Sequence, residues 1–192
     1  MSTAPKILAF AGSTREASFN KKLVKVALAG AAAAGAEVTY LDLRDLALPM
    51  FDEDIEKQGL PAGAKRLKEM MRAHQGLLIS SPEYNSSISG VLKNAIDWAS
   101  RPEPGQPSLA CFNNKVAGLM ATSPGALGGM RGLVHLRSIL GNINVIVLPG
   151  QITVGKASEA FDEAGNLKDE KQRATTQAIG AAVANTVRKL NA

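Results

Sequence analysis

Three apolar runs, each followed by a polar or glycine-rich loop, constrain the fold of this 192-residue chain more than any other feature. The runs cover residues 7–11, 77–80 and 116–120. Each run is continuously apolar rather than alternating, which is typical of strands buried on both faces of a parallel sheet. Because the carboxyl ends of such strands meet at one edge of the sheet, we expect the three loops to lie together there. A single ligand can then contact all of them.

Helix and strand patterns alternate along the rest of the chain. Helices are predicted over residues 18–34, 62–74, 88–100, 128–140 and 167–190, and further strands over 37–43 and 144–148. The segments 46–61 and 101–114 are predicted as loops, the second long and exposed. This alternation favours right-handed crossovers and one α/β domain over residues 1–192, a three-layer sandwich with helices on both faces. For five parallel strands we expect the order 2-1-3-4-5.

Composition excludes several classes of protein. There is no signal-like N-terminal segment and no apolar stretch near 18 residues, so we expect a cytoplasmic protein without a membrane partner. The single cysteine, Cys111, can form neither an internal disulfide nor a thiolate metal site, and it is interpreted as a small packing residue in a reducing compartment. His74 and His135 have no companions at metal-binding spacing, so no metal is expected and both are interpreted as surface or interface residues.

The formal charge of +5 does not indicate nucleic-acid binding, because the basic residues are dispersed and aromatic residues make up only 4% of the chain. The positive excess is better matched to a ligand that carries phosphate.

The loop after the first strand, residues 12–20, has the character of a phosphate site. A helix begins there and offers free N–H groups, and Ser13, Thr14, Ser18 and Asn20 add side-chain donors. Arg15 adds a guanidinium whose fork matches phosphate oxygens. The loop is neither a Walker loop nor a dinucleotide fingerprint, because it lacks Gly-Lys-Ser/Thr and has one glycine where three are needed. The alternative is an ordinary polar turn with a serine cap.

The loop after the third strand can bind the other end of a ligand. Pro82 restrains the backbone and Tyr84 offers an aromatic face, while Glu83 and Asn85 can orient a flat heterocycle. The alternative is that Glu83 and Asn85 cap the helix that follows.

The loop after the fourth strand combines a hydroxyl with glycines. Ser123 can donate a hydrogen bond, and Gly125, Gly128 and Gly129 let the backbone approach a ring without interference from Cβ atoms. An ordinary glycine-rich helix entry is the alternative.

These motifs together resemble a known family. Gly-Ser-Thr-Arg-x-x-Ser-Phe-Asn follows the first strand, Pro-Glu-Tyr-Asn precedes the run 90–98, and Ser123 with its glycines follows the fourth strand. Over residues 6–148 the chain is similar to the NADPH-dependent FMN reductases, in the branch that contains soluble quinone and chromate reductases. The resemblance implies a flavodoxin-like fold that holds FMN. It also implies reduction by NADPH or NADH and transfer of two electrons to a quinone, an azo compound, free flavin or a metal oxyanion such as chromate.

The resemblance also implies roles for individual residues. Ser13, Arg15, Ser18 and Asn20 are expected to bind the phosphate of FMN. Ser123 is expected to lie near the far edge of the flavin ring. The residues expected to bind the cofactor are Ser13, Thr14, Arg15, Ser18, Phe19, Asn20, Pro82, Glu83, Tyr84, Asn85, Ser123 and Gly125. No catalytic side chain is expected, because hydride passes from the nicotinamide to the flavin. With no second nucleotide domain, donor and acceptor are expected to stack in turn on one flavin face, which gives ping-pong kinetics.

Members of this family assemble as dimers or tetramers. We expect Trp98, Arg101 and the face of a helix that carries Arg131 and His135 to make that contact. The alternative is a packed tryptophan and solvated basic residues.

Proteins with other functions share this fold. A receiver domain needs an acidic cluster after the first strand, and a low-molecular-weight phosphatase needs a cysteine there, but the chain has neither. A flavodoxin-like electron carrier that does not oxidise NAD(P)H stays an alternative, although such carriers are typically acidic. A scaffolding role without flavin is the third possibility.

Overall fold

The computed structural model describes residues 4–191 and contains a five-stranded parallel sheet of order β2-β1-β3-β6-β7. The strands of this sheet are β1 (Lys6–Ala11), β2 (Glu37–Leu41), β3 (Gly76–Ser80), β6 (Val116–Thr122) and β7 (Ile146–Val154). With the separate hairpin of β4 (Glu83–Tyr84) and β5 (Ser87–Ile88) left out, the predicted order 2-1-3-4-5 is confirmed. The three central strands β1, β3 and β6 are buried almost throughout, as their unbroken apolar runs predict.

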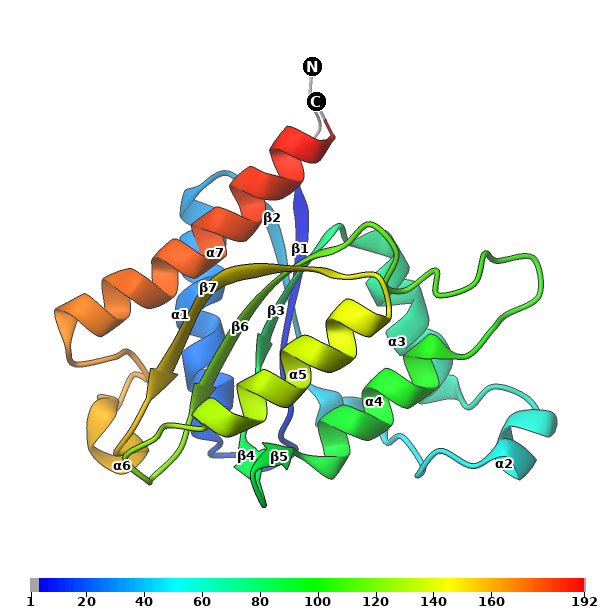
Figure 1. Cartoon of the computed structure of the whole chain (residues 1–192), viewed down its shortest axis with the longest axis horizontal. Helices are drawn as coiled ribbons and strands as arrows, with labels where there is room; N and C mark the ends of the chain where they lie inside the picture. The colour runs from blue at the N-terminus through cyan, green and yellow to red at the C-terminus, as the bar shows by residue number, and fades with distance from the viewer. Residues whose placement is uncertain (1–3, 192) are drawn as a thin grey trace.

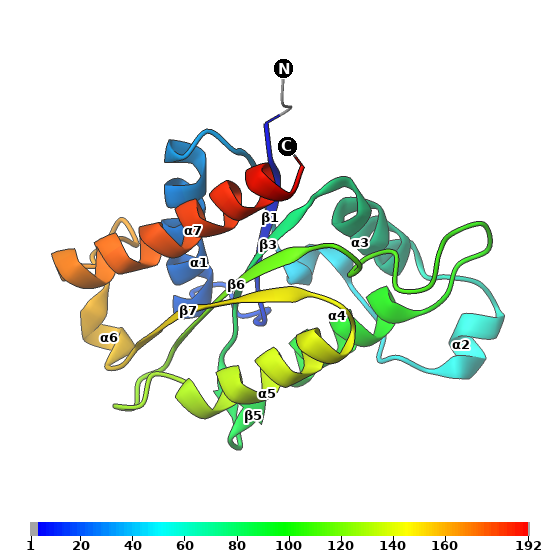
Figure 2. The same ribbon diagram turned by 45° about the horizontal axis from the view of Figure 1, so that its top comes forward.

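Helices cover both faces of the sheet, as Figure 1 shows and the tilted view of Figure 2 repeats. On one face lie α1 (Phe19–Ala33) and α7 (Glu170–Leu190), and on the other α3 (Ala62–Ala73), α4 (Gly90–Ser100) and α5 (Met130–Asn142). Alternate residues of β1 pack into separate cores, Leu8 and Phe10 on the α3–α5 side and Ile7 and Ala9 on the α1–α7 side. The fold is therefore the expected three-layer sandwich.

Helices α1 and α7 cross at a distance that only glycine permits. A Cβ atom added to Gly30 would lie 2.0 Å from the carbonyl oxygen of Gln177, and one added to Gly180 would lie 1.9 Å from that of Ala27. The backbones of the two helices are therefore in direct contact at this crossing.

Several predicted boundaries were wrong. The expected helix at 88–100 begins only at Gly90, because Ile88 pairs with Glu83 in the hairpin β4–β5. The fifth strand does not end at Leu148 but runs through Pro149 to Val154, which an edge strand with a register shift allows.

Other departures concern short helices and loop burial. The segment 46–61 contains the short helix α2 (Glu53–Lys57), and η1 (Leu43–Leu46) and α6 (Ala157–Ala160) were not predicted. The segment 101–114 is not exposed throughout, because Phe112 and Cys111 are buried in the core, where Cys111 is the small packing residue expected.

Two side chains interpreted as surface or interface residues lie inside the protein. Trp98 is fully buried, and its Nε1 donates a hydrogen bond to the carbonyl oxygen of Pro49 at 2.8 Å. His74 is also buried, with Nδ1 2.6 Å from the Met70 carbonyl oxygen and Nε2 2.9 Å from Thr39 Oγ1. The predicted roles of Trp98 at an interface and of His74 on the surface were therefore wrong.

Candidate functional site

The three loops meet at the carboxyl edge of the sheet, as the parallel strands require. The Gly12 amide donates to the Ser80 carbonyl oxygen at 2.9 Å, and the Ser81 amide donates to that of Met120 at 2.9 Å. These bonds extend the β1–β3 and β3–β6 ladders one residue into each loop. The first and second loops are tied again by Ser89, whose Oγ donates to the Gly12 carbonyl oxygen at 2.5 Å and caps α4. The loops are thus held on a rigid base.

The first loop presents an open helix N-terminus. Ser18 occupies the N-cap of α1, yet its hydroxyl accepts no hydrogen bond from the first turn, and no acidic residue lies in that turn. The amides of the turn therefore remain available to an anion, which the helix dipole also favours. Ser13 Oγ accepts a bond from the Arg15 amide at 3.3 Å, which shapes the loop in front of the helix.

Arg15 is the cation of this loop. Its guanidinium is exposed and stacks over the Phe19 ring at 5.3 Å from the centroid. None of the ion pairs within residues 4–191 involves Arg15. Phe19 in turn stacks on Phe161 at 5.9 Å, so the ring that supports Arg15 is itself anchored. An unpaired guanidinium beside open amides matches a phosphate monoester.

Asn20 is directed inward and joins α1 to the ends of β3 and β6. Its Nδ2 donates to the Thr122 carbonyl oxygen at 2.9 Å, and its Oδ1 accepts from Ser80 Oγ at 2.8 Å and from the Thr122 amide at 3.1 Å. These bonds leave one N–H of Asn20 for the phosphate contact that the sequence predicts.

The second loop forms the tight hairpin β4–β5, which projects from the edge. Asn85 and Ser86 have φ angles of +51° and +65°, which form the turn, and the Tyr84 side chain is 61% exposed. Pro82 is buried at its base. Tyr84 and Asn85 therefore lie on an exposed turn at the carboxyl edge of the sheet.

Glu83 belongs to the hairpin but its carboxylate faces α5. Oε1 accepts from Arg131 Nε at 2.7 Å and Oε2 accepts from the Gly132 amide at 3.1 Å, and only 8% of the side chain is exposed. Burial acts to raise the pKa of Glu83, but the bonds from Gly132 and Arg131 outweigh it and lower the pKa below its ordinary value. Glu83 caps α5 rather than α4, the helix considered from the sequence.

The third loop packs on the end of β7. The carbonyl oxygen of Gly125 accepts from the amides of Gly128 and Lys156, and Ser123 Oγ lies 3.4 Å from the same oxygen. At Gly129, where φ is +93°, an added Cβ would lie 2.8 Å from the Cβ of Ala121. This glycine therefore lets the start of α5 pack against β6. Gly125 is exposed, and a Cβ atom added to it would lie 3.7 Å from Ser123 Oγ.

The sequence missed an exposed apolar face beside the hairpin, made by the end of the third loop and by α5. The side chains of Leu127, Met130 and Val134 are 49%, 46% and 61% exposed, and they flank the predicted Arg131 and His135. His135 Nδ1 lies 2.9 Å from Ser87 Oγ, a second link between α5 and the hairpin. The other predicted contact residue, Arg101, pairs with Glu56 at 2.8 Å. Leu127, Met130 and Val134 are spaced three and four residues apart, which is the sequence signal of one helix face. The apolar residues of the same helix that face the core follow a similar spacing and obscured this signal.

Two further classes of site were considered within the described part of the chain. Residues 4–191 contain no group of three His, Cys, Asp or Glu side chains placed to hold a metal ion. In the same range no helix has the length and apolarity needed to cross a bilayer.

The chain is similar in sequence and in structure to several known proteins. The family model of the NADPH-dependent FMN reductases matches residues 5–159. An NAD(P)H-dependent FMN reductase of Pseudomonas aeruginosa is 38% identical over 191 residues, 99% of each chain. A 2-hydroxy-1,4-benzoquinone reductase of Burkholderia is 36% identical over 88% of this chain and 89% of its own. Among solved structures, the flavoenzyme NAD(P)H:acceptor oxidoreductase FerB of Paracoccus denitrificans has a TM-score of 0.82 and 28% identity, covering 96% of this chain and 98% of that one.

Proposed function

Because the chain belongs to the NADPH-dependent FMN reductase family, we propose that it oxidises NAD(P)H and passes two electrons through FMN to quinones. It is a flavodoxin-like oxidoreductase that uses FMN and NAD(P)H. Quinone as acceptor follows the names of its relatives, a benzoquinone reductase among them. Azo compounds, free flavin and metal oxyanions such as chromate complete the proposed acceptors. A cytoplasmic location is part of the proposal, and the single cysteine favours it.

One observation carries the cofactor assignment: the unpaired Arg15 guanidinium stands beside the uncapped N-terminus of α1, at the same edge as the exposed Tyr84 hairpin. In the proposal, the amides of α1 with Ser13, Thr14, Arg15, Ser18 and Asn20 bind the phosphate of FMN. A charged guanidinium and a helix N-terminus both favour a dianion.

The remaining site residues bind the ring in this proposal. Tyr84 and Asn85 lie on the projecting turn and meet the flat heterocycle, while Pro82 fixes the turn's base. Ser123 and Gly125 line the opposite side. FMN, when bound, supplies hydride transfer from the nicotinamide and electron transfer to the acceptor. The protein binds and orients, and no side chain is assigned as a proton donor.

A ping-pong sequence is proposed, because a single domain offers one edge site for both donor and acceptor. The NAD(P)⁺ product leaves before the acceptor enters. Initial rates measured at several fixed quinone concentrations then give parallel double-reciprocal lines against NADPH. Intersecting lines would contradict the shared site.

A homodimer or homotetramer is also proposed, with the exposed apolar face of α5 as the contact. Leu127 in the third loop and Met130 and Val134 on α5 form this face. Because α5 is bonded to the hairpin through Glu83 and Ser87, a second copy would lie close to the edge site. An apolar patch on an otherwise polar surface favours such association.

Anaerobic stopped-flow mixing of the purified protein with NADPH tests the proposed function. Loss of flavin absorbance with NADPH alone, and its return on addition of benzoquinone, is expected. Reduction that needs a separate reductase would instead identify an electron carrier. A colourless protein that binds no added FMN would refute both.

A further inference from the structure

A groove outside the edge site runs along the exposed face of α1. It has a volume of about 400 Å³ and lies between the end of β2 on one side and the segment before α7 with the first turns of α7 on the other. We call it the α1 groove, and its lining residues are Glu16, Ala17, Ser18, Lys21, Lys22, Lys25, Val26, Ala29, Tyr40, Asp42, Glu163, Ala164, Gly165, Asn166, Arg173 and Gln177. Its volume is that of a site for a nucleotide-sized molecule. Ser18 joins it to the first loop of the edge site.

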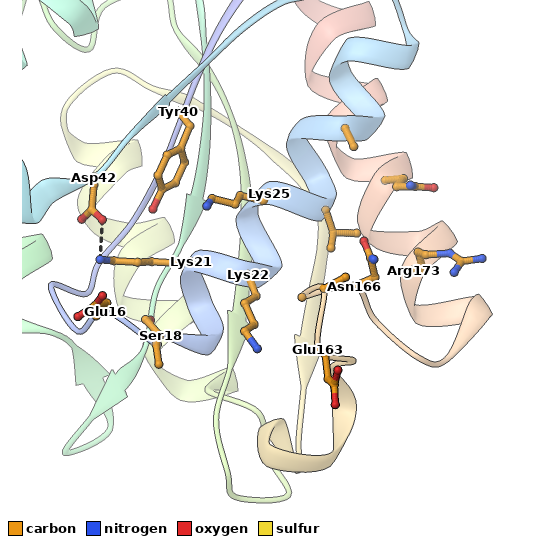
Figure 3. Close-up of a pocket in the computed structure, with 16 residues that line it drawn as sticks. Glu16, Ser18, Lys21, Lys22, Lys25, Tyr40, Asp42, Glu163, Asn166 and Arg173 are labelled. Atoms are coloured by element: carbon orange, nitrogen blue, oxygen red, sulfur yellow. Dashed lines mark hydrogen bonds and ion pairs between the residues drawn. The ribbon is translucent and has the colours of Figure 1, made fainter.

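The groove contains hydrogen-bond donors that have no partner. The Tyr40 hydroxyl is buried and forms no hydrogen bond, although buried hydroxyls are nearly always paired. Burial, with the nearby carboxylates of Asp42 and Asp45, raises the pKa of Tyr40 to about 12, so the hydroxyl keeps its proton. Figure 3 shows the Lys25 ammonium pointing toward this hydroxyl, and it lies 4.7 Å from the centre of the Tyr40 ring.

Two of the lysines are also free of carboxylates. Within residues 4–191, neither Lys22 nor Lys25 takes part in an ion pair. The Lys22 ammonium lies about equally far from the Phe19 and Phe161 rings, at 5.9 and 6.0 Å. Both lysines project from the same face of α1, three residues apart. They therefore remain available to an anion from outside the chain.

The acidic residues of the lining limit where an anion can lie. Asp42 is neutralised by Lys21, whose Nζ is 2.6 Å from Oδ2, and Arg173 pairs with Glu170. In Figure 3, Glu163 points away from Lys25 and Tyr40, whereas Glu16 lies beside the Lys21 pair. Lys22 lies at the Phe19 and Phe161 rings, so the free donors of the other end are Tyr40 and Lys25; Val26 and Ala29 of α1 add apolar atoms to the lining.

We propose that the α1 groove binds a nucleotide-sized organic phosphate, with an anionic oxygen bonded to the Tyr40 hydroxyl and to the ammonium of Lys25. Two sources share this chemistry: the phosphorylated adenosine end of NADPH, and a separate nucleotide. The first source rests on the proposed function, whereas the second does not. In either case the site is additional to the one proposed for the FMN phosphate.

Calorimetric titration of the FMN-loaded protein with adenosine 2′,5′-bisphosphate tests the site, because the flavin phosphate then fills the edge. Saturable binding to one site is expected. Lys25→Glu is expected to weaken it about tenfold or more, the loss typical of a charge-assisted bond. Lys65→Glu, an exposed change of equal charge on α3, serves as the control and is expected to leave affinity unaltered.

Tyr40→Phe separates binding from folding. Removing a hydroxyl that has no partner is expected to leave the free energy of unfolding in urea unchanged or higher, while affinity for the bisphosphate falls about fivefold. Absence of binding to the FMN-loaded protein, equal affinities of Lys25→Glu and Lys65→Glu, or unaltered affinity of Tyr40→Phe would each overturn the proposal.

Steady-state kinetics then identify the source. If the adenosine end of NADPH occupies the groove, Lys25→Glu raises the KM for NADPH relative to that for NADH. If both KM values stay the same while bisphosphate binding weakens, the occupant is a separate nucleotide. The flavin content of each variant reports on the proposed function independently, because bisphosphate binding is measured without turnover.

Discussion

Replacing Glu83 with glutamine tests whether the hairpin is held through α5. The carboxylate accepts bonds from Arg131 and from the Gly132 amide, 48 and 49 residues further along the chain. Glutamine keeps the shape and one acceptor oxygen but removes the charge. The change therefore isolates the electrostatic part of the contact between the hairpin and the start of α5.

The magnitude follows from the two contacts. Because the Arg131 side chain is 58% exposed, the ion pair is worth at most about 1 kcal/mol. A negative charge at a helix N-terminus adds about 0.3–1 kcal/mol. Together these predict that Glu83→Gln lowers the free energy of unfolding at pH 7 by about 0.5–2 kcal/mol.

The loss depends on pH in a defined direction. Because the folded protein lowers the pKa of Glu83 below its ordinary 4.5, the stabilisation is fully present above that value. It disappears as the pH falls through the lower, folded pKa. The difference between the wild-type protein and the variant should therefore shrink under acid conditions.

Urea unfolding of both proteins between pH 7 and pH 3 measures this difference. Glu37→Gln is the control, since Glu37 forms only an exposed pair with Lys6 at 3.8 Å, and it is expected to change stability by less than about 0.5 kcal/mol. A Glu83→Gln effect no larger than the control, or one that grows toward low pH, would refute the reasoning.

Three further changes test other parts of the account. Arg15→Ala should weaken FMN binding by about 1.5–3 kcal/mol in a fluorescence titration, since a charge-assisted phosphate contact is lost, while exposed Arg66→Ala should not; equal affinities would remove Arg15 from the site. Val134→Glu places a charge on the exposed face of α5, so sedimentation should show smaller assemblies of folded protein, and an unaltered assembly would exclude that face. Gly129→Ala should destabilise the protein by about 1–3 kcal/mol, because φ is +93° and the methyl group meets Ala121, whereas Gly141→Ala in the open part of α5 should not; similar melting of the two would contradict this packing.

The sheet and the meeting of the three loops at one edge were predictable from the sequence because their signals are local. A strand buried on both faces leaves an unbroken apolar run, and a loop that begins a helix leaves a polar cluster next to it. The order of the strands then follows from the usual winding of such sheets. Arg15 and Tyr84 were identified in this way, and both are exposed at the expected edge.

The misplaced residues depend on partners far away in the chain. Trp98 is buried because Phe51 and Pro49, from a loop more than 40 residues earlier in the chain, cover it. The Glu83 carboxylate faces α5 because its partners, Arg131 and the Gly132 amide, lie there, 48 and 49 residues further along the chain. No periodicity in the sequence reports such pairings.

Short elements were missed for another reason. Two-residue strands carry no alternation, so the segment of the hairpin was interpreted as a ligand-binding loop followed by a helix from Ile88. The end predicted at Leu148 was wrong because β7 is an edge strand, where a residue without an N–H such as Pro149 is tolerated.

A crystal structure of the protein loaded with FMN tests the central claim most directly. The account predicts phosphate density at residues 13–18, bonded to the first-turn amides of α1 and to Arg15, with the ring beside Tyr84. Flavin bound at any other place, or no flavin in crystals grown with saturating FMN, would contradict it.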